Sequence, residues 1–219
     1  MTENRRKFTR ESEARRREDL ILATLSLIAE TGVRSATVRG IAARASVTQG
    51  LIRHYFATKE ELIVAAYDYH MKRMTDAVAQ TGEAASARDR LRDFVSASLS
   101  PPVVDPGWVA LWAAFLSEAI HDPQMQDTHE NTYRYFRDQL EALIMAVLDE
   151  SGDTADSDTC RDLAIACNAV LDGLWLEGGA LPGKFGEGAL VKIGLRSVGA
   201  ILGLPLDGAM PENTERDEE

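Results

Sequence analysis

The segment from Thr37 to Lys59, TVRGIAARASVTQGLIRHYFATK, places the tightest constraint on what this chain can fold into. Thr37 is a good helix N-cap. The apolar residues that follow it recur at helical spacing and predict one short helix: Val38, Ile41, Ala42 and Ala45. The pattern breaks at residues 45–47, and a second apolar stripe then predicts another short helix: Val47, Leu51 and Ile52. The segment therefore predicts two short helices around a tight turn.

The opposite face of the second helix is polar, because Thr48, Gln49, Gly50 and Arg53 fall there. In the first helix, Arg39 and Arg44 are free to face outward, and no residue of the segment is acidic. A helix-turn-helix needs a recognition helix that hides one face and presents short polar side chains to base edges and phosphates. The segment thus indicates a protein that reads DNA.

The segment also resembles the TetR family of bacterial transcriptional regulators. Its matching residues lie where that family has an alanine-rich second helix, a recognition-helix glycine and an H-[YF]-F-x-x-K ending: Ala42 to Ala45, Val47, Gly50, Tyr55, Phe56 and Lys59. The stretches GLIRHYF and DGLWLEGGA look most similar to the BetI subgroup of betaine-pathway repressors. The resemblance implies a homodimeric, ligand-responsive repressor that binds a pseudo-palindromic operator and is released by a small-molecule effector.

Nine residues of this region are candidates for contacting DNA: Thr37, Arg39, Thr48, Gln49, Gly50, Arg53, His54, Tyr55 and Lys59. Arg53 either forks onto a guanine edge, a contact worth about 1–3 kcal/mol of discrimination, or only holds phosphates. Gly50 would let the backbone approach DNA closely, although a solvated surface turn is the alternative for the start of this helix. Tyr55 and Lys59 suit phosphate contacts. His54 either reaches a phosphate or is an inert surface histidine.

The charge distribution agrees with a DNA-binding end. The chain as a whole has a net charge of −11, which by itself argues against binding to phosphates. Residues 1–60, however, hold 12 Lys and Arg against 7 Asp and Glu, a net +5, whereas residues 61–219 hold 12 against 28, a net −16. We therefore expect one end to bind DNA while the rest is repelled from it.

Strand patterns are nearly absent, and helical periodicity recurs between turn signals, so the predicted fold is all-α. A first helix should close near Thr31 and Gly32, and Thr58 with Glu61 forms a capping box for a fourth. Further helices are expected at about residues 87–99, 108–120, 124–149, 158–181 and 188–202, with an acidic loop at 149–162. We predict a helix-turn-helix domain over residues 1–60, a helical effector-binding and dimerisation domain over 61–204, and an acidic disordered tail over 205–219.

The N-terminal segment is basic and carries Arg5, Arg6, Lys7, Arg10 and Arg15 to Arg17. Either it tracks phosphates or a minor groove, or it is a disordered solubilising tail. It has no apolar core and no small-residue cleavage site, and no apolar run in the chain reaches membrane length, so a cytoplasmic protein is expected. Cys160 and Cys167 are expected to be small core residues rather than a disulfide.

The last two predicted helices suggest a homodimer. The stretch GALVKIGLRSVGAILGL is apolar on almost every side, so it should be covered on more than one face. Pairing it with the helix at residues 163–176 in each of two subunits would give a four-helix interface. The alternative is a central core helix in a monomer. A two-fold dimer would place two heads on half-sites about one helical turn, or a multiple of it, apart.

The acidic region after residue 60 contains much of the aromatic content of the chain. Its candidate effector-binding residues are Trp108, Trp112, Phe115, Glu118, Tyr133, Asp172 and Trp175. Tryptophan and tyrosine faces beside a carboxylate would suit a cation, and the BetI-like resemblance points to choline or a related compound. The alternative is that these aromatic residues only form the core.

The sequence leaves two other functional classes to compare with a regulator. Glu118 and His121 match the Glu-x-x-His spacing of helical di-iron enzymes, but such a site needs the motif twice and no second copy exists. No Cys/His ligand pattern, phosphate-binding glycine loop or G-x-S-x-G elbow is present, so neither catalysis, a metal nor a cofactor is expected. A DNA-binding protein without sequence specificity is the third possibility, and its affinity would fall with salt equally for all sequences.

Overall fold

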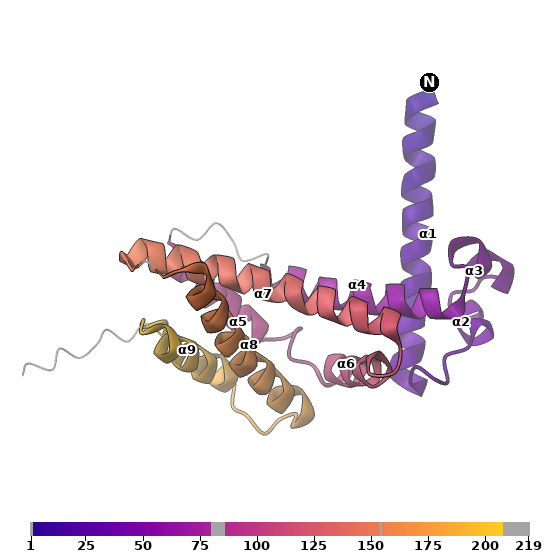
Figure 1. The fold of residues 1–219 in the computed structure, drawn as a ribbon. Coiled ribbons are helices and arrows are strands. Elements are labelled where there is room, and N and C mark those ends of the chain that lie inside the picture. The colour runs from indigo at the N-terminus through magenta and orange to yellow at the C-terminus, as the bar shows by residue number, and fades with distance from the viewer. Residues whose placement is uncertain (1, 80–85, 154, 208–219) are drawn as a thin grey trace, which may run out of the picture. The chain divides into compact units, whose positions relative to one another are not determined.

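The computed structural model describes residues 2–79, 86–153 and 155–207. All regular secondary structure in these residues is helical (Figure 1), which confirms the predicted fold class. The helices are α1 (Thr2–Thr31), α2 (Val38–Arg44), α3 (Gln49–Tyr55), α4 (Lys59–Ala79), α5 (Ala87–Ser98), α6 (Pro106–Ala119), α7 (Pro123–Ser151), α8 (Ser157–Ala180) and α9 (Ala189–Leu202).

Local capping explains where several helices begin and end. Gly32, with φ of 78°, follows the last residue of α1, as expected for a glycine that ends a helix. The Thr58 hydroxyl accepts the N–H of Glu61 at 3.0 Å, so the predicted capping box forms before α4. The Glu61 carboxylate accepts the N–H of Ala57 at 2.7 Å, one residue earlier than in the standard motif.

The acidic loop is shorter than predicted, because residues at both of its ends are helical. Helix α7 continues to Ser151 and α8 begins at Ser157. Asp156 accepts the N–H of Thr159 at 2.8 Å, and this bond lowers the pKa of the Asp156 carboxyl. Glu150 accepts the N–H of Ala87 at 2.8 Å, at the start of α5. Acidic side chains at helix N-termini are favourable, so these carboxylates serve the fold.

The basic N-terminal segment is helical in the structure. It forms the first part of the 30-residue helix α1, whose sequence contains neither Gly nor Pro. The guanidinium of Arg17 lies 4.8 Å from the ring centroid of Phe56, a cation–π contact. Contact between the remaining arm residues and DNA stays a prediction, and the acidic stretch at 208–219 lies outside the described residues.

The chain divides into two compact units. One comprises residues 1–74 and 107–133 and is called the head unit here; the other comprises residues 75–106 and 134–219 and is called the body unit. Helices α4 and α7 each continue from one unit into the other. The boundaries predicted at residues 60 and 204 separate regions by their function, whereas these two units are defined by compactness. The predicted boundaries therefore stay predictions.

The core of the head unit joins the two short helices to the longer ones. Its largest fully buried side chains come from α1 to α4, from α6 and from the residue after α3: Leu20, Ile28, Ile41, Ile52, Phe56, Leu62, Tyr67 and Phe115. Ile52 and Phe56 are 2% and 1% exposed, so the inner face of α3 is anchored in this core. This burial leaves the other face of α3 outward.

In the body unit, α8 and α9 lie side by side and α5 packs against both (Figure 1). Cys160 and Cys167 are free and buried in α8, as expected for core residues. At the end of α9 the chain turns sharply through Gly203, whose φ is 66°, and the N–H of Leu204 donates to the carbonyl of Gly199 at 2.9 Å. A Cβ at Gly199 would lie 2.5 Å from the Leu204 carbonyl oxygen, so this turn requires glycine there.

Candidate DNA-binding interface

The α2–turn–α3 segment forms the predicted helix-turn-helix. Thr37 caps α2 by accepting the N–H of Gly40 at 3.1 Å. In the turn, Ser46 has φ of 54°, and the N–H of Val47 donates to the carbonyl of Ala42 at 2.9 Å. Thr48 then caps α3 and accepts the N–H of Leu51 at 3.3 Å. Two threonine caps and a left-handed residue thus set the direction of the recognition helix.

Most of the nine candidate residues are solvent-exposed. Exposed positions are Thr37, Arg39, Thr48, Gln49, Gly50, Arg53 and His54, while Tyr55 and Lys59 are half-buried. Tyr55 packs against the head core and meets His54 edge to face, with ring centroids 5.1 Å apart. Thr48 was expected to contact DNA, and its hydroxyl is also the cap of α3. Residues 37–59 contain no acidic side chain that would repel DNA phosphates.

Arg44 is exposed, in line with the predicted outward position, but its side chain is paired with residues of α1. Its guanidinium donates to the Ser26 hydroxyl at 2.7 Å and to both carboxylate oxygens of Glu30, one of them at 2.5 Å. This hydrogen bonding lowers the pKa of the Glu30 carboxyl. Both partners lie on α1, which packs against α2, so Arg44 ties the two helices together. A forked guanidinium suits this bidentate role.

A second tie, which sequence reasoning missed, connects α4 to α1. The Tyr69 hydroxyl donates to the Glu18 carboxylate at 2.6 Å, and this bond to the carboxylate raises the pKa of Tyr69. The two residues are 51 positions apart, and neither stands in a recognisable motif. The helices that carry the recognition segment are therefore joined by polar contacts as well as by the core.

The candidate effector-binding residues do not all belong to one unit. Trp108, Trp112, Phe115, Glu118 and Tyr133 lie in the head unit, and Asp172 and Trp175 lie in the body unit. In the body unit, Trp175 is buried and donates its indole N–H to the carbonyl of Val103 at 2.8 Å. The Asp172 carboxylate accepts the side-chain amide of Asn168 at 2.9 Å.

In the head unit, Trp108 and Tyr133 each lie beside a histidine that the sequence interpretation left aside, His70 and His129. Phe115 is fully buried and stacks on Tyr67, with ring centroids 4.7 Å apart. The Tyr67 hydroxyl lies 2.5 Å from Nδ1 of His129, and the His129 ring is 4.8 Å from that of Tyr133. Burial raises the pKa of Tyr67 well above its usual range.

His70 is the most unusual polar group of this cluster. It is 5% exposed, its ring centroid lies 5.1 Å from that of Trp108, and burial lowers its pKa to about 4. Among the described residues, its Nε2 atom has no hydrogen-bond partner. A buried polar atom without a partner costs free energy unless a water or ligand satisfies it. In the sequence, no motif around His70 predicts that its side chain is buried with an unsatisfied nitrogen.

Glu118 and His121 do not form the paired ligands of a di-iron site. Helix α6 ends at Ala119, so His121 lies beyond it, and Glu118 forms an ion pair with Arg34 at 3.0 Å. Within the described part of the chain, no group of three or more His, Cys, Asp or Glu side chains is placed to hold a metal ion. No helix in the same residues is long and apolar enough to cross a bilayer.

Two protein families match the chain in succession. Residues 20–66 match the family described as bacterial regulatory proteins of the tetR family, which covers α2, α3 and parts of α1 and α4. Residues 87–203 match the family described as BetI-type transcriptional repressor, C-terminal. The second match covers the helices from α5 to α9.

Individual relatives are named as BetI regulators. The HTH-type transcriptional regulator BetI of Burkholderia thailandensis is 31% identical over 181 residues, which cover 81% of this chain and 89% of that protein. The regulator of the same name from Paraburkholderia xenovorans is 33% identical over 172 residues, which cover 77% and 84%.

Solved structures share the fold. A transcriptional regulator from Pseudomonas aeruginosa PAO1 superposes with a TM-score of 0.78 at 30% identity, covering 87% of this chain and 92% of that one. A regulator from Saccharomonospora viridis, solved in complex with choline, superposes with a TM-score of 0.65 at 24% identity, covering 88% and 96%. With its helix-turn-helix and both family matches, the chain belongs to the TetR family of transcriptional regulators and has a BetI-type C-terminal region.

Proposed function

We propose that this regulator acts in the bacterial cytoplasm as a homodimeric repressor, that α3 of each subunit reads one half of a pseudo-palindromic operator, and that a small organic cation releases it. The outward face of α3 carries the proposal. Gln49, Gly50, Arg53 and His54 are exposed there, while Ile52 anchors the opposite face. Arg53 is the one side chain of this face that suits bidentate guanine recognition.

Neighbouring groups support phosphate binding around α3. Arg39 is exposed on α2, and Lys59, the first residue of α4, supplies a positive charge four residues after the end of α3. Tyr55 is half-buried against the head core, which holds its ring in place. Its hydroxyl is a candidate donor to a phosphate. We infer that these residues set the register of α3 on the duplex, and that Arg53 supplies base discrimination.

The homodimer is supported by an unpartnered small-residue stripe on α8. Ala169, Gly173, Leu176 and Ala180 recur at helical spacing and are all exposed, and no atom lies within 4 Å of the position of a Cβ on Gly173. On α9, Ile193 is 44% exposed. Small residues let a second helix approach closely, so the proposed interface pairs α8 and α9 with their copies in a second subunit.

Selection of genomic DNA fragments by the purified protein tests the DNA-binding part. Wild type should recover fragments that share a pseudo-palindrome, and Arg53→Ala should lose that preference. Lys184→Ala is the matched control, because it removes one exposed positive charge from the body unit. Uniform weak recovery that falls with salt for every sequence would instead indicate non-specific DNA binding and refute operator recognition.

The dimer is tested by Leu176→Glu, which places a charge on the α8 stripe. Light scattering should show a dimer for wild type and a monomer for the variant, and operator binding should fall with it. Ile120→Glu is the control, because Ile120 is 72% exposed and belongs to the head unit rather than to α8 or α9. A Leu176→Glu protein that stays dimeric contradicts this interface.

The cationic effector is supported by half-buried aromatic rings in the head unit. Trp108, Trp112 and Tyr133 are half-buried, and the predicted residues of that unit include one carboxylate, Glu118, which is paired with Arg34. The unsatisfied Nε2 of His70 beside Trp108 supplies a polar group for a hydroxyl. Phe115, Asp172 and Trp175 remain candidates from the sequence, although Phe115 and Trp175 are core residues and Asp172 bonds to Asn168.

Thermal titration distinguishes a cation site from a merely apolar one. Choline should raise the melting temperature saturably, because a ligand that binds the native state stabilises it. Its uncharged isostere 3,3-dimethylbutanol should not, since it lacks the charge that aromatic faces attract. Choline should also weaken operator binding by about 5- to 150-fold, the usual range of coupling between two sites. No response to choline, glycine betaine or polyamines would remove the cationic class.

A further inference from the structure

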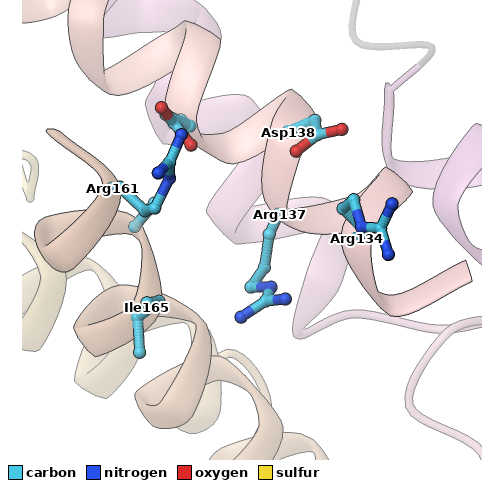
Figure 2. Close-up of a pocket in the computed structure, with 7 residues that line it drawn as sticks. Arg134, Arg137, Asp138, Arg161 and Ile165 are labelled. Atoms are coloured by element: carbon cyan, nitrogen blue, oxygen red, sulfur yellow. The ribbon is translucent and has the colours of Figure 1, made fainter. Parts of the chain in front are cut away.

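A pocket of about 270 Å³ opens between α7 and α8 in the body unit (Figure 2). Its lining contains three arginines, two acids and two apolar residues: Arg134, Arg137, Asp138, Glu141, Arg161, Ala164 and Ile165. Figure 2 shows the Arg137 side chain extending from α7 into the opening and that of Arg161 extending from α8 toward α7. The pocket therefore receives guanidinium groups from both helices.

These arginines are unusual for their surroundings. The body unit holds 10 Lys and Arg against 22 Asp and Glu, a net charge of −12, and three of its ten cationic residues line this pocket. In such an acidic unit, arginines are expected to pair with carboxylates, as Arg92 does with Asp89. Within the described residues, the side chains of Arg134, Arg137 and Arg161 make no hydrogen bond or ion pair. Their donors are available to a ligand.

The composition of the lining defines the chemistry of that ligand. Guanidinium groups present a planar fork of donors that matches the oxygen atoms of a carboxylate or a phosphate. Asp138 and Glu141 accept hydrogen bonds and repel a purely anionic molecule, which favours a ligand with hydroxyl donors as well. Ala164 and Ile165 supply a small apolar wall.

We propose that this pocket binds a small hydroxylated organic anion, whose carboxylate or phosphate is held by Arg137 and Arg161. Arg134 adds positive charge at the edge, the hydroxyl groups donate to Asp138 and Glu141, and the carbon chain lies against Ile165. All residues that line this pocket belong to the body unit, whereas the aromatic residues proposed for the cationic effector belong to the head unit. It gives the regulator a second, oppositely charged ligand class.

The pocket is tested by thermal titration of the full-length protein with inorganic phosphate, glycerol 3-phosphate and malate, with chloride at matched ionic strength as reference. Glycerol 3-phosphate or malate should raise the melting temperature saturably and more than inorganic phosphate does, because only these two carry hydroxyl donors and a carbon chain. The tighter of the two identifies the anionic group as phosphate or carboxylate.

Variants locate the binding. Arg137→Ala should weaken it at least 10-fold, and Arg137→Lys should recover only part, since lysine keeps the charge but loses the fork. Arg53→Ala removes the same charge from α3 in the head unit, so it tests whether the anions bind at the DNA-binding face instead. It should leave the thermal titration with these anions unchanged. Arg161→Ala serves as the second pocket variant, with circular dichroism checking that each variant folds.

Three results would overturn the proposal. The first is the absence of saturable binding by every probe. The second is wild-type binding by folded Arg137→Ala and Arg161→Ala proteins, and the third is loss of binding in Arg53→Ala alone. Arginine side-chain NMR signals give an independent readout, because the Nε–H resonances of Arg137 and Arg161 should shift on titration while that of Arg53 stays in place.

Discussion

Replacing Gly50 by alanine should stabilise the protein while weakening its binding to operator DNA. Gly50 is the second residue of α3, it is exposed, and the nearest atom to a Cβ built there is the Thr48 hydroxyl at 3.8 Å. Nothing in the free protein therefore resists a methyl group. A glycine inside a helix costs about 1 kcal/mol relative to alanine, and in the first turn we expect about half of that. For a chain of this size the melting temperature should rise by about 1–2 °C.

The same methyl group would lie between α3 and the DNA backbone if Gly50 allows close approach. A loss of about 1.4 kcal/mol per head corresponds to 10-fold in affinity, so a dimer on a full operator should lose roughly 100-fold. Fluorescence anisotropy with labelled operator measures this loss, and differential scanning calorimetry measures the stability. Equal operator affinity in the variant would refute the close approach, and a lower melting temperature would refute the open space around Gly50.

Three further predictions concern stability. Gly199→Ala should lower the free energy of unfolding by about 1–3 kcal/mol in urea titrations, because its Cβ would meet the Leu204 carbonyl oxygen at 2.5 Å. Thr58→Ala should cost about 1 kcal/mol by removing the cap of α4, whereas Thr58→Ser should cost little. His70 has a pKa of about 4 in the folded protein against about 6.5 in the unfolded chain, so the unfolded chain takes up the proton first as pH falls. The free energy of unfolding should therefore not depend on His70 above pH 6.5, and it should fall by up to about 3 kcal/mol as pH drops to 4. Unfolding titrations across that range should show a shallower pH dependence for His70→Phe.

Local sequence determined most of the fold. Thr37, Thr58 and Gly32 mark helix ends through bonds that span three or four residues, so their effects can be predicted from neighbouring positions. The exposed face of α3 was equally predictable, because burial of Ile52 follows the helical period. The acidic stretch at 149–162 misled the prediction, since acidic residues suit both a solvated loop and helix N-termini.

Contacts between distant segments were decided by the tertiary structure alone. Arg44 looked free because Glu30 stands on another helix, and the two meet only once α1 packs on α2. Likewise, Tyr67 and His129 are 62 residues apart, and Arg137 shares a pocket with Arg161 from a different helix. A period of 3.6 residues states which face of a helix is apolar, but which helix covers that face depends on packing over the whole chain.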